Sequence, residues 1–167
     1  MCIRDRGYIY IGMDHFAKPD DELALAQQAG TLYRNFQGYS THADCDLIGF
    51  GATSIGMIGD SYSQNMKGLE EYYTRIDNNQ LAVFRGIQLN ADDRLRRAII
   101  TELICNFTLE FATIEREYSI AFNDTFRPEL AELADMQADG LLTLDAAGIR
   151  VLPPGRLLIR NICMVFD

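Results

Sequence analysis

The segment best suited to contact a ligand is glycine-rich and runs from Gly51 to Gly59, with Gly49 just before it. Its glycines permit close backbone approach, and Ile55 adds a stiff, branched surface on which a ring could pack. The spacing puts Ser54 where a dinucleotide-binding fingerprint needs its third glycine, and the G-K-[ST] ending of a phosphate loop is absent. The segment is therefore either one wall of a small ligand pocket or a tight structural turn.

The two histidines are the other candidates for chemistry. His42 lies in the string HADCD with Asp44, Cys45 and Asp46, which offers mixed nitrogen, sulfur and oxygen ligands, but the spacing matches no closed metal site. His15 follows a predicted strand, where a general base could act and a hydrogen-bonded structural role is equally reasonable. We therefore predict no metal ligand in this chain.

The cysteines are widely spaced and form no C-x-x-C pair. They are Cys2, Cys45, Cys105 and Cys163. Because no secretory signal is visible, we expect free thiols and a reducing, cytoplasmic compartment. Cys105 and Cys163 lie in apolar strings, LIC and NICMVF, and are predicted to be buried as small hydrophobic residues.

The net charge and the hydropathy exclude two classes of partner. The chain has 167 residues and a formal net charge of -9, with 15 basic and 24 acidic side chains. Binding to a polyanion needs clustered Lys and Arg, so we expect no nucleic acid as partner. No apolar run approaches the roughly 20 residues of a membrane-spanning helix, so we expect no membrane insertion.

The elements that must position these residues are short in the first part of the chain. Residues 8–13 are β-branched and aromatic and predict a strand, and residues 19–21 with Gly30 mark the two ends of a helix. Residues 46–50 are interpreted as the strand before the glycine-rich segment. Residues 65–78 show helical spacing.

From about residue 90 onward the pattern is mainly helical. Asn90 can cap a helix that continues through Ile104, and residues 141–152 predict a β-hairpin around the turn DAAG. Three further helices are predicted, over 114–118, 128–140 and 155–166.

This order of elements resembles a winged-helix arrangement, which usually suggests DNA binding. The charge argues against it, since residues 87–167 hold more acidic than basic side chains. The predicted helix over 128–140 contains no Lys or Arg, and its charged residues are Glu129, Glu132, Asp135 and Asp139. Phosphate would repel such a recognition helix.

Four segments together resemble the oxygen-independent coproporphyrinogen III oxidases. They are YIGMDHFAKPDDELALA at 10–26, RNFQGYSTHADCDLIG at 34–49, LRRAIITELICNF at 95–107 and GRLLIRNICMVFD at 155–167. The resemblance covers nearly all of the chain after Gly7. The MDHFA and RNFQGY strings are its most specific parts, and the related haem-chaperone branch of the superfamily is less similar in them.

The resemblance implies a fold of the α+β or mostly α class. It implies the terminal strands of a (β/α) radical S-adenosylmethionine barrel, followed by a helical, winged-helix-like C-terminal domain. The expected divisions are a spurious leader at 1–6, the C-terminal edge of the barrel at 7–60, a connecting helix and loop at 61–90, and the helical domain with its small hairpin at 91–167.

The resemblance also implies an activity for the full-length enzyme. That activity is the radical-based oxidative decarboxylation of two propionates of coproporphyrinogen III to the vinyls of protoporphyrinogen IX, in haem biosynthesis. It uses S-adenosylmethionine and a 4Fe-4S cluster, and the intact enzyme is expected to be a monomer. The cluster motif C-x-x-x-C-x-x-C is absent here. We therefore expect a C-terminal fragment that is inactive alone and holds no catalytic residue.

Two residues of this chain match cofactor-binding positions of the family. Gln37 matches the glutamine of the R-N-[FY]-Q-G-Y string, and Ile55 matches the isoleucine of the glycine-rich loop; both are assigned by resemblance to a second S-adenosylmethionine. The alternative hypothesis is a stand-alone module that binds a porphyrin or S-adenosylmethionine without chemistry.

Overall fold

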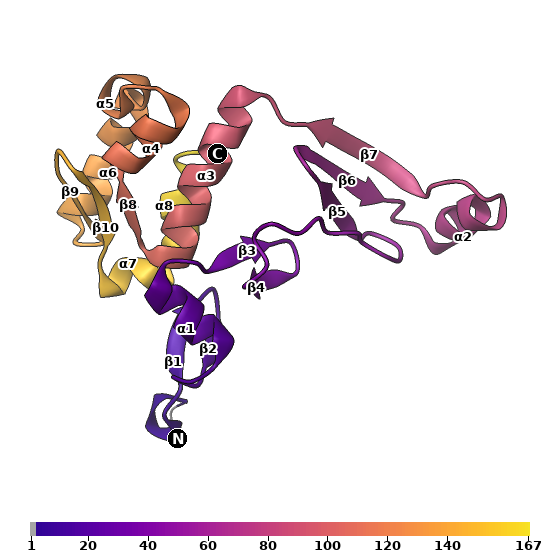
Figure 1. The fold of residues 1–167 in the computed structure, drawn as a ribbon, viewed down its shortest axis with the longest axis horizontal. Helices are drawn as coiled ribbons and strands as arrows, with labels where there is room; N and C mark the ends of the chain where they lie inside the picture. The colour runs from indigo at the N-terminus through magenta and orange to yellow at the C-terminus, as the bar shows by residue number, and fades with distance from the viewer. Residues whose placement is uncertain (1–2) are drawn as a thin grey trace. The chain divides into compact units, whose positions relative to one another are not determined.

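The computed structural model describes residues 3–167 and divides into two compact units (Figure 1). Unit 1 comprises the chain up to Ala43 together with Leu95–Asp167, and unit 2 is Asp44–Arg94. The expectation of a mixed helix and strand fold is confirmed. All strand pairings among the described residues are antiparallel. The barrel edge, the winged-helix likeness and the four expected divisions stay predictions, and residues 1–2 of the proposed leader lie outside the described residues.

The first part of unit 1 consists of two small hairpins and one helix. In chain order its elements are a 3-10 turn at Arg4–Arg6, β1 (Ile9–Gly12), β2 (His15–Ala17), α1 (Glu22–Ala29), β3 (Tyr33–Asn35) and β4 (Gly38–Ser40). The predicted ends of α1 are confirmed. The Asp21 side chain accepts a hydrogen bond from the Leu23 N–H, and Gly30 ends the helix in the left-handed region with φ 69°.

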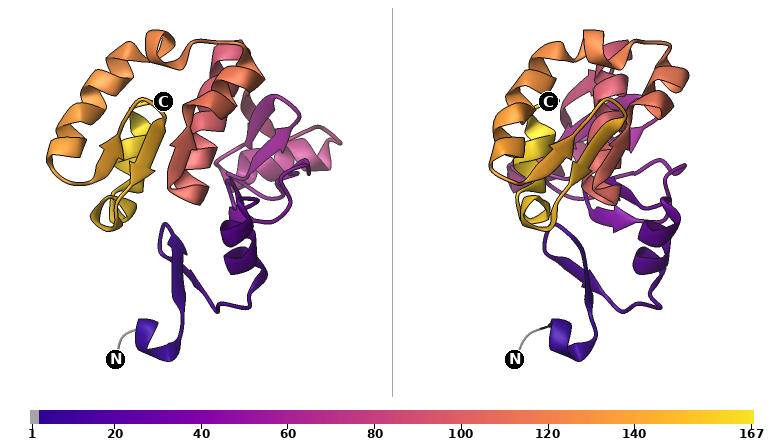
Figure 2. Two further views of the ribbon diagram at one scale, coloured as in Figure 1. Left: turned by 60° about the vertical axis from the view of Figure 1, so that its left-hand side comes forward. Right: turned by 90° about the vertical axis from the view of Figure 1, so that its left-hand side faces the viewer.

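The second part of unit 1 is mainly helical. Its elements are α3 (Ala91–Asn106, which starts in unit 2), β8 (Thr108–Glu110), α4 (Phe111–Tyr118), α5 (Phe122–Thr125), α6 (Arg127–Ala138), β9 (Leu142–Leu144), β10 (Gly148–Val151), α7 (Pro153–Leu157) and α8 (Ile159–Met164). The predicted hairpin is confirmed as β9 and β10, and β10 also pairs with β8. Helix α6 runs beside this sheet (Figure 2).

The single helix predicted over 155–166 is wrong in detail. The structure has α7 and α8, separated at Leu158. The Leu158 N–H donates to the Gly155 carbonyl, three residues back, instead of continuing the four-residue ladder. Pro153 and Pro154 fix the start of α7 because proline is well accommodated in the first helical turn.

Most of the core of unit 1 lies between α3, the β8–β10–β9 sheet and the last helices. Four phenylalanines occupy its centre. The rings of Phe111 and Phe122 stack at 4.1 Å, and Phe122 also contacts Phe126 and Phe166. A second, smaller cluster joins β1, β2 and α1 to Cys105 on α3. This second cluster fixes the two N-terminal hairpins to the end of α3.

Unit 2 is a three-stranded sheet with one helix. Its elements are β5 (Ile55–Ile58), β6 (Ser61–Asn65), α2 (Leu69–Asp77) and β7 (Val83–Gln88), with the strand order β5-β6-β7. Its buried apolar side chains are few: Met57, Ala82 and Leu89. Many others are exposed, among them Ile48, Phe50, Ile58, Leu81 and Phe84.

Three sequence-based expectations are wrong in unit 2. Residues 46–50 form no strand, and only Leu47 makes an isolated bridge, to Met57. The glycine-rich segment is not a loop throughout, because its residues 55–58 form strand β5 and pair with β6. The helix expected from residue 65 begins only at Leu69, since Asn65 still belongs to β6.

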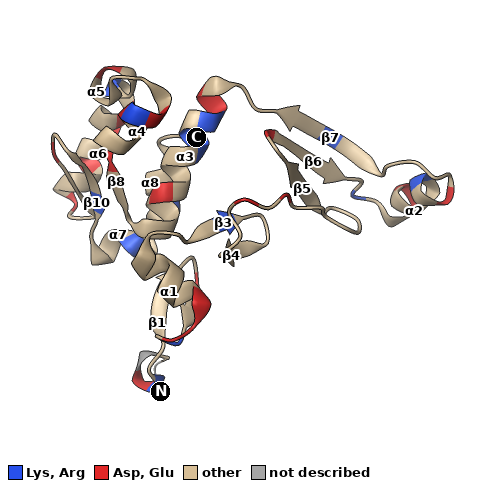
Figure 3. Cartoon of the chain, viewed as in Figure 1, with Lys and Arg blue, Asp and Glu red and all other residues tan. Residues whose placement is uncertain are grey.

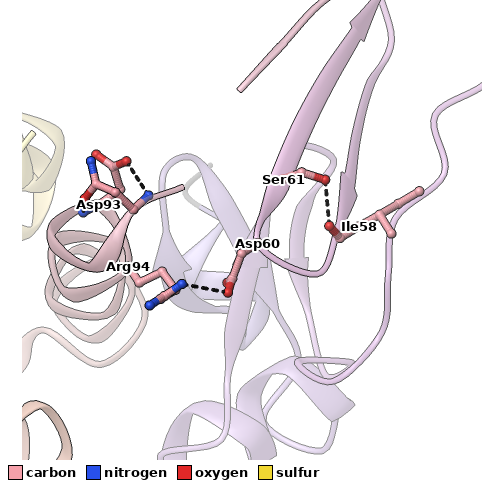
Figure 4. Close-up of polar contacts among 6 residues, drawn as sticks. Ile58, Asp60, Ser61, Asp93 and Arg94 are labelled. Atoms are coloured by element: carbon pink, nitrogen blue, oxygen red, sulfur yellow. Dashed lines mark hydrogen bonds and ion pairs between the residues drawn. The ribbon is translucent and has the colours of Figure 1, made fainter. Parts of the chain in front are cut away.

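The start of α3 confirms the predicted cap. The Asp93 N–H donates to Asn90 Oδ1 at 3.0 Å, and the Asn90 N–H donates to Asp93 Oδ2 at 2.9 Å. Arg94 pairs with Asp60 at 3.1 Å, at the turn between β5 and β6 (Figure 4). The ion pair and the cap both lie within unit 2, and the ion pair joins the β5–β6 turn to Arg94.

Acidic side chains lie along α6, as expected from the sequence (Figure 3). The helix begins at Arg127, one residue earlier than predicted, and Arg127 pairs with Asp124 at 2.6 Å.

No helix among residues 3–167 is both long and apolar enough to cross a membrane.

Candidate functional site

The two N-terminal hairpins of unit 1 meet at Tyr39. The Tyr39 hydroxyl donates to the carbonyl of Ile104, near the end of α3, at 3.0 Å. The ring of His15 lies edge-on to the Tyr39 ring, with centroids 5.1 Å apart and planes at 82°. Gly12 allows the Tyr39 side chain to lie close to the β1 backbone, because a Cβ at position 12 would collide with the Tyr39 hydroxyl. The chain thus brings His15 of one hairpin against the other.

A positive charge covers the same ring. Arg34 is the cross-strand partner of Tyr39, and its guanidinium carbon lies 5.1 Å from the ring centre. Its Nη1 is buried and has no hydrogen-bond partner among the described residues. Burial is the main cause that raises the pKa of Tyr39 above its usual value, with the nearby Cys105 adding to it. Tyr39 therefore stays a neutral hydrogen-bond donor.

Gln37 lies at the tip of the β3–β4 hairpin and is exposed. Asn35 fixes this turn, because its Oδ1 accepts from the N–H groups of Gln37 at 2.8 Å and Gly38 at 3.3 Å. An exposed amide on a turn anchored in this way can meet a ligand. Its role in binding a cofactor stays a prediction.

Ile55 is half-buried at the start of β5 in unit 2, opposite Gln64 of β6. Gln37 and Ile55 thus belong to different units, and each is described within its own. The backbone of Ile55 packs closely on Gly49, where an added Cβ would lie 2.8 Å from the Ile55 carbonyl oxygen. This contact explains the glycine at position 49 without a ligand.

Asn65 and Tyr72 hold the glycine-rich segment, and sequence reasoning missed both. Asn65 Nδ2 donates to the carbonyls of Gly49 and Gly51 and to the hydroxyl of Ser54. The Gly51 N–H donates to the Tyr72 hydroxyl at 3.2 Å, and Ser54 Oγ donates to the Gly51 carbonyl at 2.8 Å. Because these groups bind one another, the segment has the bonding of a tight turn and not that of a phosphate cradle. An asparagine outside the apolar pattern gave no signal of this role.

The HADCD string forms no metal centre. Within residues 3–167, no group of three or more His, Cys, Asp or Glu side chains is placed to hold a metal ion. His42 instead lies near its neighbours, with Nδ1 at 3.4 Å from Ser40 Oγ and 3.3 Å from Thr41 Oγ1. Asp46 accepts a hydrogen bond from the Gly59 N–H at 2.8 Å.

Two of the described cysteines are buried, as predicted. Cys105 and Cys163 are buried in unit 1, and Cys45 is exposed. Burial raises the pKa of both buried thiols to about 12, with Glu102 adding to the effect at Cys105. Both thiols are therefore protonated at neutral pH.

The buried thiols predict a loss of stability in alkali. An unfolded chain releases these protons near pH 9, whereas the folded chain keeps them until about pH 12. Between these values the folded state binds more protons, so the free energy of unfolding should fall as the pH rises and be unaffected by these groups below pH 9. Urea unfolding followed by circular dichroism at several pH values measures the fall.

Two alanine variants separate this effect from general alkaline damage. Cys105→Ala should show a smaller fall than the parent, and Cys45→Ala, which removes an exposed thiol, should show the full fall. Equal pH dependence in all three proteins would contradict the assignment.

Known proteins resemble this chain throughout its length. Residues 89–158 match the HemN C-terminal domain family. The oxygen-independent coproporphyrinogen III oxidase of Pseudomonas aeruginosa is 56% identical over 161 residues, and that of Escherichia coli K12 is 55% identical over 161 residues. A solved structure, "Coproporphyrinogen III oxidase (HemN) from Escherichia coli is a Radical SAM enzyme", superposes with a TM-score of 0.94 at 53% identity and covers 99% of this chain.

The resemblance to oxygen-independent coproporphyrinogen III oxidases is confirmed. The chain spans about a third of these relatives, 35% of both the P. aeruginosa and the E. coli oxidase, and 38% of the solved structure. The segment that matches the HemN C-terminal domain contains α3 and the β9–β10 hairpin.

Proposed function

We propose that this chain acts as the C-terminal part of an oxygen-independent coproporphyrinogen III oxidase. The complete enzyme would convert two propionates of coproporphyrinogen III to the vinyls of protoporphyrinogen IX by radical-based oxidative decarboxylation. The observation that carries the proposal is the combination of 53% identity and a TM-score of 0.94 over 99% of the chain. Identity at this level over almost every described element supports retention of the family's activity.

The chemistry would come from cofactors of the complete enzyme. S-adenosylmethionine and a 4Fe-4S cluster would supply the radical, and the cluster ligands would lie outside this chain. The wide spacing of the cysteines, without a C-x-x-x-C-x-x-C motif, supports this division. Gln37 and Ile55 would contact S-adenosylmethionine, the first through its amide and the second by packing on an apolar part of the ligand.

The scarcity of buried apolar side chains in unit 2 supports a place within a longer protein. A unit of this size with so small a core needs further cover for independent stability. Two of its exposed apolar residues, Leu81 at 84% and Phe84 at 55%, would be covered by other parts of the enzyme. Residues 7–60 would then complete the edge of the barrel, with the winged-helix-like part following. The complete protein would be a cytoplasmic monomer.

A chimera tests the proposed function directly. Residues 8–167 replace the matching segment of the E. coli relative, and the purified protein is reconstituted anaerobically. We expect turnover of coproporphyrinogen III that depends on S-adenosylmethionine, measured as protoporphyrin after oxidation. A folded chimera with a full iron content and no turnover would contradict the proposal.

In this chimera, Gln37→Ala and Ile55→Ala should each lower turnover and S-adenosylmethionine affinity. A lost hydrogen bond or packing contact of this kind typically costs about 1 to 3 kcal/mol, or about ten- to a hundred-fold in binding. Iron content should stay at the parent level, because the cluster ligands lie in another segment. Affinity is measured by equilibrium dialysis and iron by colorimetric analysis.

Matched substitutions at nearby positions serve as controls. Gln28→Ala removes an exposed amide from α1, and Ile58→Ala removes an exposed branched side chain from the other end of β5. Both should behave like the parent. If Gln37→Ala and Ile55→Ala also do so, the two residues have no part in cofactor binding.

A further inference from the structure

The turn between β1 and β2 holds Met13 in a backbone conformation that methionine disfavours. Met13 and Asp14 both have positive φ, at 44° and 65°. Glycine, asparagine and aspartate dominate two-residue hairpin turns with this geometry, so Asp14 suits its position and Met13 is the strained residue. Such strain persists only where the surroundings fix it, and it gathers at functional sites. The residue placed by this turn is His15.

The proton positions on His15 follow from its contacts. Nδ1 lies 2.8 Å from the carbonyl oxygen of Met13. A carbonyl can only accept, so Nδ1 carries a proton and donates it across the turn. In the neutral ring Nε2 is then an acceptor. No hydrogen bond to Nε2 is made within the described part of the chain, and the side chain is exposed.

Nε2 is presented beside the tip of the other hairpin. A Cβ at Gly38 would lie 3.3 Å from Nε2, and Gln37 directly precedes Gly38. The Asn35 side chain fixes the turn of Gln37, and the Tyr39 ring fixes the imidazole. A strained turn, a defined tautomer and two anchored hairpins therefore bring a hydrogen-bond acceptor next to the candidate ligand residue.

We propose that Nε2 of His15 accepts a hydrogen bond from a donor group of the ligand bound at Gln37. The inference rests on the proposed function, which offers two sources of such a donor. One is S-adenosylmethionine, with its ammonium, amino and hydroxyl groups, and the other is a pyrrole N–H of the porphyrinogen. His15 is thus a ligand-binding residue of the same site.

Two amide substitutions of His15 test the roles of the two ring nitrogens separately. In His15→Asn the amide nitrogen replaces Nδ1 and can still donate to Met13, but the acceptor is lost. In His15→Gln the amide reaches the position of Nε2, but the bond across the turn is lost. We measure S-adenosylmethionine affinity by equilibrium dialysis and the KM for coproporphyrinogen III in the chimera described above.

We expect His15→Asn to lose about ten- to a hundred-fold in one of these two quantities, and His15→Gln to lose much less. A change in S-adenosylmethionine affinity identifies the cofactor as the donor, and a change confined to KM identifies the porphyrinogen. The opposite ranking, or two variants equal to the parent, would overturn the proposal, because the histidine would then serve only the turn.

A measurement on the parent chimera covers the case in which the variants do not fold. With residues 8–167 labelled with ¹⁵N in a segmental ligation, only His15 and His42 contribute labelled imidazoles. His42→Asn assigns the two signals. The Nε2 resonance of His15 should shift on addition of S-adenosylmethionine or of the porphyrinogen, and an unmoved resonance with both would overturn the proposal.

The design distinguishes this inference from the proposed function. A chimera without turnover whose His15 resonance and affinities still respond as expected leaves the binding role intact and removes the activity. An active chimera in which His15 responds to neither ligand leaves the activity intact and removes the role of His15.

Discussion

The Phe122→Ala variant is expected to lower the free energy of unfolding of unit 1 by about 3–5 kcal/mol. Phe122 is fully buried at the centre of the phenylalanine cluster, stacked on Phe111 and in contact with Phe126 and Phe166. Removing the ring loses its transfer free energy and leaves a cavity among the side chains of Phe111, Phe126 and Phe166. Urea unfolding followed by far-ultraviolet circular dichroism measures the loss.

An exposed phenylalanine provides the comparison. Phe50 is 87% exposed, so Phe50→Ala should change the unfolding free energy by less than about 0.5 kcal/mol. A Phe122→Ala variant as stable as the Phe50→Ala variant would mean that the cluster around α5 does not form the core described above.

The second large effect is expected at Gly155, the buried glycine in α7. An added Cβ would collide with the carbonyl oxygen of Leu141 and lie 3.1 Å from Val151 Cγ1. The Leu141 oxygen cannot move freely, because it accepts a hydrogen bond from the Leu152 N–H at 2.9 Å. Gly155→Ala should therefore cost about 3 kcal/mol through overpacking and the weakened bond. Thermal and urea unfolding both report it.

Gly140→Ala is the matched control, one residue before Leu141. Gly140 has a φ of 71° and open space around its Cβ position. Alanine there should cost only the strain of the left-handed region, about 1 kcal/mol. Equal losses at the two glycines would contradict this prediction, because only Gly155 is packed against the Leu141 carbonyl.

The parts of the fold that could be predicted from sequence are those with local signals. Asp21 and Gly30 bound α1 through a side-chain cap and a left-handed terminator, and Asn90 caps α3 through Asp93. The DAAG turn also folds locally, since Asp145 Oδ1 accepts from the N–H groups two and three residues ahead. Each signal works within a few residues, so tertiary packing does not override it.

The rest depended on contacts between distant residues. Strand β7 is exposed along its whole length and shows no alternation of apolar and polar residues, so only its pairing with β6 defines it. Asn65 likewise holds the glycine-rich segment by donating hydrogen bonds to carbonyls 14 and 16 residues away. At the candidate site, Gln37 and Ile55 were predicted from family resemblance, whereas the contact of His15 with Tyr39 needs two hairpins to meet.

Unit 1 is built from two stretches of sequence that are separated by unit 2, which affects the order in which its parts can fold during translation. The hairpin of Tyr39 emerges well before α3, yet the Tyr39 hydroxyl needs the carbonyl of Ile104, and Gln27 needs that of Cys105. Those partners are 65 and 78 residues later in the chain. While unit 2 is being translated, the hairpins can pack only on α1, because α3 has not yet been made. A translational pause within unit 2 should therefore prolong the protease sensitivity of the nascent hairpins, and a pause after α3 should not.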